Sequence, residues 1–304
     1  MQTRTYEQTL REAAASDENI VVMTAENRVA IRNLAAELGN RFIDVGIAEA
    51  TMVGAAAGLA LRGRKPVVHA LATFLTMRAF EFIRTDVGIA HLPVKLVGGV
   101  PGFLSDGNGP THQALEDVSL MRGIPGMQVF SPADAEDLVI GLPSILASDS
   151  PCYIRYNALP AAIKHSAQFE TGKAEIVTEG TDVAILVHGF LLREVMRALP
   201  VLKDAGLSAR VVNMRMLAPV DEDEIVRAAA QCGLLVTVED HFNTGGLGSI
   251  VAEVLDRRRT PARHVTLGMD GRWFTPGLLE SVIENEGFTG PRIAGKILSA
   301  MSNN

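Results

Sequence analysis

Cysteine and aromatic residues are scarce in this sequence of 304 residues, which has two cysteines and an aromatic fraction of 5%. Cys152 and Cys232 lie far apart without the spacing of a metal-binding motif, so neither a disulfide scaffold nor a zinc knuckle is expected. Long uncharged apolar runs are missing too. Residues 50–61 form one of the longest, well short of the roughly 18 residues that a membrane-spanning helix needs. We therefore expect no membrane partner.

Basic residues are outnumbered: Lys and Arg total 28 against 35 for Asp and Glu, giving a formal net charge of −7. No basic block occurs, so nucleic acid is not an expected partner, because neutralising phosphates requires clustered Lys and Arg. The first twenty residues carry charges and no apolar segment typical of a signal peptide, which predicts a cytoplasmic protein. A hydrophobic fraction of 47% indicates a cored globular protein and excludes a disordered chain.

Short apolar, β-branched runs alternate with helical patterns along the whole chain. This alternation predicts βαβ units and an α/β fold with parallel sheets buried on both faces. The predicted strands are residues 20–23, 42–45, 67–70, 94–97, 127–130, 152–155, 183–187, 209–213, 234–238 and 264–267. The predicted helices include residues 48–62, 76–91, 134–147, 191–205 and 221–231.

The strand series breaks between residues 157 and 180. Leu159-Pro160 follows the last strand of the first series, and residues 165–180 are polar and weakly periodic. We place a boundary at residue 165, which predicts two α/β domains in tandem, residues 1–165 and 166–304.

One candidate for chemistry is Glu49, which follows a predicted strand and opens a predicted helix. The carboxyl ends of parallel strands border the ligand crevice of α/β folds, so its position suits an active site. The alternative is a first-turn acid favoured by the helix dipole. The same helix carries Gly54 and Gly58 on one face, which permits close helix contact.

Two glycine-rich segments are further candidates. Residues 98–113 hold five glycines and two prolines and end in Thr111-His112-Gln113, and long loops of this kind are usually functional or disordered. The alternative here is a solvated turn. Residues 245–249, Gly-Gly-Leu-Gly-Ser, open another predicted helix but fit neither G-x-G-x-x-G nor a P-loop. Close packing in a turn explains them better than phosphate binding.

Together these segments resemble the C-terminal half of the thiamine-diphosphate-dependent transketolase family, which includes 1-deoxyxylulose-phosphate synthase. The resemblance spans nearly the whole chain, and the Glu49 segment followed by Gly-Pro-Thr-His-Gln is its most specific part. The matching segments are residues 41–49, 53–60, 65–67, 73–74, 109–113, 125–127 and 245–249.

The resemblance implies a thiamine-diphosphate-binding pyrimidine domain with a parallel sheet, followed by a transketolase C-terminal α/β domain. In this family a different domain holds the diphosphate and its Mg²⁺, through Gly-Asp-Gly and a later Asn. Gly-Asp-Gly occurs nowhere in this sequence. We therefore expect a split enzyme, in which a separate N-terminal-half subunit supplies the diphosphate domain and the Mg²⁺ site, in an α2β2 assembly. No metal ligand is expected on this chain.

The resemblance also implies roles for single residues. Glu49 would bind N1′ of the aminopyrimidine and activate the cofactor to its ylid. Phe74 would pack on the pyrimidine ring, with Phe80 as a second candidate. His112 would bind hydroxyls of the donor sugar, and Arg155 would bind a substrate phosphate.

Two departures from the family pattern bear on the substrate. Relatives commonly have Asp before Gly-Pro-Thr-His-Gln, where this chain has Asn108, which keeps a hydrogen bond to a substrate hydroxyl but loses the charge; neighbouring Asp106 offers compensation. Residues 98–104 also lack the His or Arg that often binds phosphate in relatives.

The expected function is transfer of a two-carbon ketol unit between sugars, with sugar phosphates as the favoured substrates. One alternative is an enzyme like 1-deoxyxylulose-phosphate synthase. Another is the β subunit of a 2-oxoacid dehydrogenase first component, but the Gly-Pro-Thr-His-Gln motif argues against this β subunit. A non-catalytic interaction module with the same fold is the alternative from another class.

Overall fold

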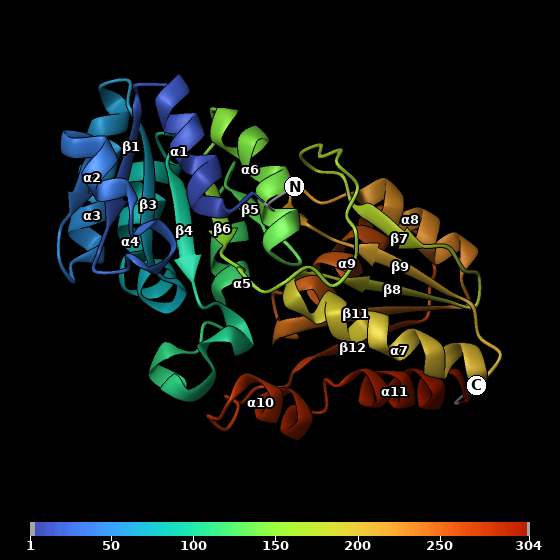
Figure 1. Ribbon diagram of the computed structural model, residues 1–304. Coiled ribbons are helices and arrows are strands. Elements are labelled where there is room, and N and C mark those ends of the chain that lie inside the picture. Colours follow the sequence, from blue (N-terminus) through green and yellow to red (C-terminus); the bar gives the residue numbers. More distant parts are fainter. Residues whose placement is uncertain (1–3, 303–304) are drawn as a thin grey trace.

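The computed structural model describes residues 4–302, whose strands form two sheets lying side by side (Figure 1). The first sheet has seven strands in the order β10-β5-β6-β4-β3-β1-β2, all parallel except β10. Its strands are β1 (Ile20–Thr24), β2 (Phe42–Asp44), β3 (Lys65–Leu71), β4 (Lys95–Gly99), β5 (Gln128–Phe130), β6 (Cys152–Arg155) and β10 (Met216–Ala218).

The second sheet has five strands in the order β12-β11-β8-β9-β7, with β7 antiparallel to β9 and the others parallel. Its strands are β7 (Glu175–Thr178), β8 (Val183–Val187), β9 (Ala209–Asn213), β11 (Leu234–Phe242) and β12 (His264–Met269). The mainly parallel α/β fold expected from the sequence is thus confirmed.

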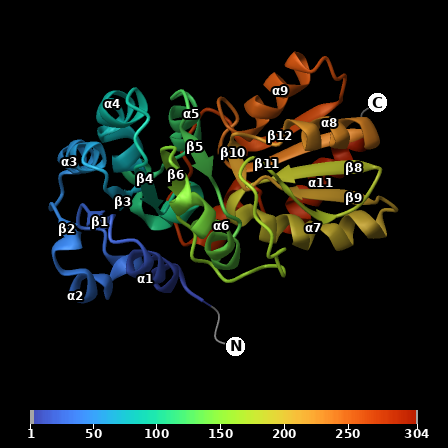
Figure 2. The same ribbon diagram turned by 90° about the horizontal axis from the view of Figure 1, so that it is seen from above.

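Helices cover both faces of each sheet, as the view from above shows (Figure 2). On the first sheet, one face is covered by α1 (Tyr6–Ser16), α2 (Leu34–Leu38) and α6 (Ala135–Ala147), and the other by α3 (Glu49–Leu61), α4 (Phe80–Phe82) and α5 (Asp117–Arg122). On the second sheet, one face is covered by α7 (Leu192–Asp204), α10 (Leu279–Glu286) and α11 (Gly290–Ser302), and the other by α8 (Glu222–Gln231) and α9 (Leu247–Arg257).

The strand pattern explains these layers. Successive strand residues point to opposite faces, so a strand buried on both sides must be apolar throughout. In β1, Val21 and Met23 pack with the α3 side of the sheet, whereas Ile20 and Val22 pack with α1 and α6. All five residues of β1 are buried.

Each strand predicted from the sequence is present, but β7 and β10 were not predicted. Both are short antiparallel strands at a sheet edge. The predicted helix over residues 76–91 is also not continuous. Two π-helical turns, η3 (Phe74–Arg78) and η4 (Ile83–Gly88), flank α4, with bonds such as that from the Ala79 N–H to the Phe74 carbonyl. Such turns often occur at functional sites.

The two domains share structure near their junction. β10 follows β9 in the chain but pairs with β5 of the first sheet, and Met216 is buried in the first domain's core. The boundary at residue 165 remains a prediction.

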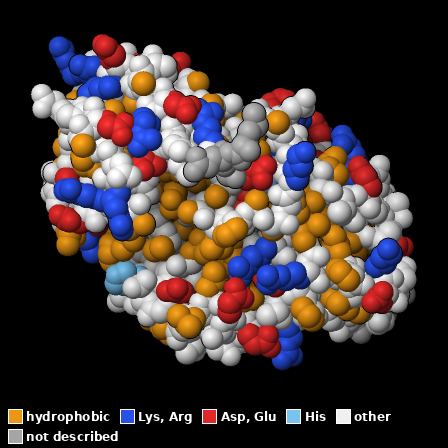
Figure 3. All heavy atoms as spheres, in the orientation of Figure 1, with side chains coloured by type: hydrophobic (Ala, Val, Ile, Leu, Met, Phe, Trp, Pro, Cys, Tyr) orange, Lys and Arg blue, Asp and Glu red, His pale blue; other side chains and the backbone are white. Residues whose placement is uncertain are grey.

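Charged side chains of both signs are interspersed over the face seen in Figure 3, with apolar side chains gathered between them. Across residues 4–302, no helix is both long and apolar enough to cross a membrane.

Candidate functional site

Glu49 begins α3 directly after the turn that leaves β2. Gly46 has a φ of 71°, a conformation that favours glycine, and its N–H donates to Asp44 Oδ1 at 2.9 Å. This tight turn places Glu49 at the carboxyl end of the first sheet, where the residue is 2% exposed. The position expected from the sequence is therefore the one observed.

Arg78 is the ion-pair partner of this buried carboxylate. Its guanidinium donates to Glu49 Oε2 at 2.9 Å and lies over the ring of Phe74, 4.3 Å from the ring centroid. The Arg78 side chain remains half exposed. The other carboxylate oxygen, Glu49 Oε1, accepts no hydrogen bond within residues 4–302.

Phe74 connects this pair to His112. The two rings are 5.0 Å apart at an interplanar angle of 67°, an edge-to-face contact. Thr73, next to Phe74, donates its hydroxyl to the His112 carbonyl at 2.7 Å. The structure thus brings together Glu49, Phe74 and His112, three residues singled out from separate sequence segments.

Asn108 and Phe80 are placed differently. Asn108 is exposed in η5 (Gly102–Asn108), and its amide donates to the Ser105 carbonyl at 2.8 Å. The neighbouring Asp106 has a φ of 37°, and its carboxylate accepts the Gly107 N–H. Phe80 is partly buried against the core beside α3, without a ring contact to Phe74 or His112 among the described residues.

Arg155 is not accessible. At the end of β6 it is 2% exposed, and its guanidinium binds Asp117 Oδ2 and Asp240 Oδ1, both at 2.8 Å. The prediction that Arg155 binds a substrate phosphate requires a free guanidinium, which this geometry does not provide. The anion that a buried arginine needs comes from the chain itself.

The Arg155 cluster has the electrostatics of a structural network. Burial alone would raise the pKa of Asp117, but Arg155 holds it below its usual value. For Arg155, burial opposes the charge, yet the two carboxylates raise its pKa above the ordinary value. His188, which faces Arg155, has its pKa lowered to about 4 by burial and by that guanidinium. Since Asp117 and Asp240 belong to different domains, this network joins them.

The glycine segment at 245–249 encloses a carboxylate. Glu239 accepts the N–H groups of Leu247 at 2.6 Å and Gly248 at 2.8 Å, so it caps the start of α9. A Cβ on Gly246 would lie 2.0 Å from Glu239 Oε2. Close packing therefore accounts for these glycines.

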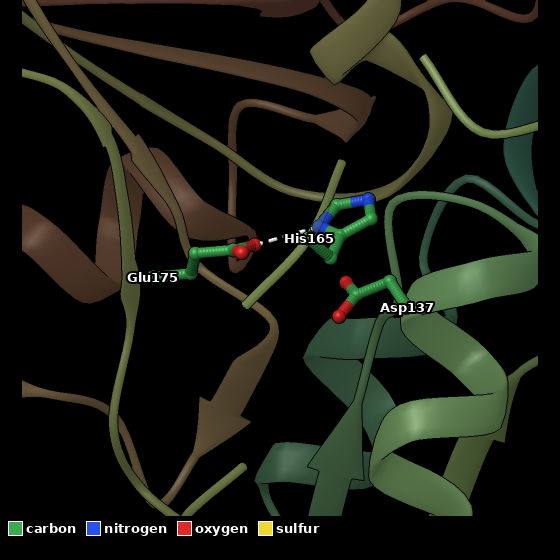
Figure 4. A group of neighbouring side chains, drawn as sticks. All are labelled: Asp137, His165 and Glu175. Atoms are coloured by element: carbon green, nitrogen blue, oxygen red, sulfur yellow. Dashed lines mark hydrogen bonds and ion pairs between the residues drawn. The ribbon is translucent and has the colours of Figure 1, made fainter. Parts of the chain in front are cut away.

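A second buried cluster lies between α6 and β7 (Figure 4). His165 binds Glu175 at 2.7 Å through Nδ1 and Asp134 at 2.9 Å through Nε2, and Asp137 lies beside it. Burial would lower the pKa of His165, but the bonds to the two carboxylates raise it to about 10. Arg215 pairs with Asp137 at 2.9 Å and with Glu175 at 2.5 Å, so the cluster is a network of ion pairs that joins the two domains.

The sequence reasoning missed Arg78. The π-helical turn η3 directs the Arg78 side chain towards Glu49. The sequence predicted a regular helix over residues 76–91, so this turn was not expected. The signal available in the sequence was a lone arginine in the otherwise apolar stretch from Phe74 to Phe80. Together, a buried carboxylate, an aromatic face and an imidazole at the carboxyl edge of the sheet can hold a flat nitrogen heterocycle and a polyhydroxylated substrate side by side.

Two protein-family models match the chain. Residues 1–159 match the transketolase pyrimidine-binding domain, and residues 172–293 match the transketolase C-terminal domain.

Individual relatives agree with these matches. The chain is 39% identical over 294 residues to the 6-deoxy-6-sulfo-D-fructose transketolase subunit SqwH of Clostridium sp. (strain MSTE9), covering 95% of this chain and 91% of that protein. It is 35% identical to a 1-deoxy-D-xylulose-5-phosphate synthase of Caldanaerobacter subterraneus, but spans only 48% of that protein. A solved structure described as a split-gene transketolase, an inactive β4 tetramer, superposes with a TM-score of 0.89 at 33% identity, covering 98% of this chain and 97% of that one.

Proposed function

The chain belongs to the transketolase family, and on that premise we propose that it is the subunit of a split transketolase that provides the pyrimidine half of a thiamine-diphosphate site. The observation that carries this proposal is the contact series from Glu49 through Arg78 and Phe74 to His112 at the carboxyl edge of the first sheet. The reaction is transfer of a two-carbon ketol unit between sugars.

The residues present fit an aminopyrimidine. Glu49 is 2% exposed, and its Oε1 accepts no hydrogen bond among the described residues, which leaves that oxygen available to a ring nitrogen. Phe74 offers the aromatic surface on which a flat ring packs. When bound, thiamine diphosphate supplies a nucleophilic carbon that carries the two-carbon unit.

Each residue of this chain then has a defined task. Glu49 binds the ring nitrogen N1′ of the pyrimidine and holds a proton there, shielded from water by its burial. Phe74 packs on the pyrimidine and fixes its plane. His112 is held at its carbonyl by Thr73, at its ring by Phe74 and at Nδ1 by the Thr111 hydroxyl, 3.0 Å away, which leaves Nε2 for the donor's hydroxyls.

Asn108 gives the donor site a neutral amide where relatives commonly have a carboxylate. We expect the Asn108 amide to hydrogen-bond a substrate hydroxyl next to the one that His112 binds. Because Arg155 is buried and paired with two carboxylates, we propose that other residues bind a phosphate or sulfonate on the substrate. We assign that task to the partner subunit.

The second subunit supplies the diphosphate-binding domain and the Mg²⁺ site, because Gly-Asp-Gly is missing from this chain. Support comes from SqwH, a protein named as a transketolase subunit, which this chain matches over 91% of its length. We expect an α2β2 complex. Gly58 on α3 faces open space, which leaves this small-residue helix free for contact with another chain.

Reconstitution with a partner chain carrying Gly-Asp-Gly tests the proposal. Calorimetry should show negligible affinity of this chain alone for thiamine diphosphate and tight, Mg²⁺-dependent affinity of the complex. Strong binding by the isolated chain would contradict the split site. Hydrogen–deuterium exchange at cofactor C2 should then be lost in Glu49→Gln, since an amide cannot hold the proton.

A donor panel separates the two family activities. Ketoses such as fructose 6-phosphate and 6-deoxy-6-sulfofructose should serve as donors for the complex. Turnover of pyruvate with release of carbon dioxide, and none of any ketose, would favour an activity like that of 1-deoxyxylulose-phosphate synthase instead.

A further inference from the structure

The loop that carries Asn108 and His112 is fastened at its base to the second domain. The Gly102 N–H donates to the Ala114 carbonyl at 3.0 Å, which closes the loop. Beside this closure, the Phe103 N–H donates to Asp240 Oδ2 at 3.3 Å. The Phe242 N–H donates to the Leu115 carbonyl at 2.8 Å. Both ends of the loop are therefore bonded to β11.

Aromatic packing strengthens the attachment. Phe103 is fully buried, and its ring meets Phe274 and Phe288 edge-to-face at centroid distances of 5.2 Å each and Phe190 at 6.4 Å. All three partners belong to the second domain. In Figure 1 the loop lies beside α10, the helix between Phe274 and Phe288.

The loop backbone is strained in a way that its own residues do not explain. Val100 has a φ of 48° and Asp106 a φ of 37°. Positive φ is costly for a side chain and especially for a β-branched one, and such conformations persist only where the surroundings hold them. Val100 borders a pocket lined by first-domain residues, whereas the segment around Asp106 packs beside α10 of the second domain.

Gln113 adds a side-chain bond at the functional end of the loop. It is 1% exposed, and its Nε2 donates to the Phe274 carbonyl at 2.9 Å. Its Oε1 has no hydrogen-bond partner among the described residues. A buried, unpaired amide oxygen costs stability that an apolar side chain would not. The stabilising contribution of this amide is therefore its bond to the second domain.

The backbone around His112 is thus held from both domains. Thr73 of the first domain binds the His112 carbonyl, and the next residue, Gln113, is bound to Phe274 of the second. We propose that Gln113 is a positioning residue, through which the second domain fixes His112 for substrate binding. This inference rests on the proposed role of His112.

Gln113→Leu in the reconstituted complex tests the proposal, with Gln128→Leu as the matched control. Gln128 lies in β5 of the same domain, and its amide makes no side-chain hydrogen bond among the described residues. Gln113→Leu should lower kcat/KM for fructose 6-phosphate roughly tenfold to a hundredfold, the scale of a small misplacement of a binding group. Gln128→Leu should stay within about twofold. Cofactor affinity and exchange at cofactor C2 should be unchanged in both.

A second variant gives a readout that a purely structural role would not move. In Gln113→Glu, the protonated carboxyl can donate to the Phe274 carbonyl, whereas the ionised form cannot. Burial favours the protonated form, so kcat/KM relative to the parent should recover as the pH falls from 8 to 6. A ratio that stays as low as that of Gln113→Leu at every pH would overturn the proposal, whereas a ratio near one throughout would mean that the carboxyl is protonated over the whole range.

Amide hydrogen exchange distinguishes this inference from the proposed function. Peptides covering residues 100–115 should exchange faster in Gln113→Leu than in the parent, and peptides from β1 or β8 should not. If the parent complex turns over no ketose but the loop still loses protection, the proposed function has failed and the attachment stands. If ketose turnover is normal and Gln113→Leu changes neither kcat/KM nor loop exchange, the positioning role is refuted.

Discussion

The guanidinium of Arg78 lies 2.9 Å from the buried carboxylate of Glu49 and 4.3 Å from the centroid of the Phe74 ring. One half-exposed cation therefore contacts both groups assigned to the aminopyrimidine. The contact depends on the π-helical turn η3 (Phe74–Arg78), which ends at this arginine.

The pair should be energetically coupled in the free chain. A double-mutant cycle with Arg78→Met and Glu49→Gln isolates the interaction. Because the arginine is half exposed, we expect a coupling energy of about 0.5–1 kcal/mol in urea unfolding, close to the upper range for exposed pairs. A coupling of zero would mean that the ion pair does not persist in solution.

His112 should matter for donors and not for the cofactor. A site built to bind a hydroxyl loses its partner when the imidazole is removed. His112→Ala should lower kcat/KM for ketose donors by about 10²-fold, which corresponds to about 3 kcal/mol. Thiamine-diphosphate titrations of the complex should show nearly unchanged affinity. A loss of cofactor binding equal to the loss of activity would move His112 into the cofactor site.

Asn108 should tune donor choice. Asn108→Asp restores the carboxylate common in relatives, and it should change the order in which donors differing at their hydroxyl-bearing carbons are used. Initial rates over a ketose panel provide the test. An unchanged order would show that the exposed Asn108 does not reach the substrate.

Arg155 should be structural. Arg155→Met leaves Asp117 and Asp240 buried without their cation, which should cost about 3–5 kcal/mol of unfolding free energy. The control is Arg257→Met, in an exposed pair with Glu222, with an expected cost below about 1 kcal/mol. Folded Arg155→Met should lose equal activity toward phosphorylated and unphosphorylated acceptors. A selective loss for phosphorylated ones would restore the phosphate role expected from the sequence.

The His165 network predicts how stability depends on pH. The pKa of His165 is raised to about 10 in the folded chain against about 6.5 when unfolded, so its stabilisation is complete below pH 6.5 and is lost as the pH rises towards 10. Burial opposes the charge of Glu175, but the bond from His165 lowers its pKa to about 2, so its contribution is lost as the pH falls from about 4.5 towards 2.

His165→Gln isolates the alkaline part of this dependence. Urea unfolding at pH 6.5, 8 and 9.5 should show stability falling more steeply in the parent than in the variant. Parallel curves would show that His165 is not charged in the folded chain.

The sequence predicted most of the fold because its strands are apolar runs of the right length. β1 and β8 are buried along their whole length. A strand buried on both faces is a continuous apolar run, so it can be predicted from its own residues without knowing which strands it pairs with. β7 and β10 were missed because they are short edge strands whose pairing is decided by the tertiary structure.

The candidate site likewise has residues that the sequence could predict and contacts that it could not. Glu49, Phe74 and His112 lie in recognisable motifs, and the structure brings them together. Arg155 resembled a substrate ligand because its partners, Asp117 and Asp240, are 38 and 85 residues away in sequence. No local pattern reveals a carboxylate at that distance.

The course of β10 limits how this chain can be divided. A fragment ending at residue 165 would lack the strand that covers the outer edge of β5, and Met216 would be missing from the core beneath it. The exposed edge would offer unpaired N–H and carbonyl groups to another molecule, a common origin of aggregation. Extending the fragment to Ala218 would restore β10 but would cut the second sheet between β9 and β11 and expose the edge of β8. The two domains should therefore be expressed together, and fragments ending at residue 165 or at Ala218 should both aggregate.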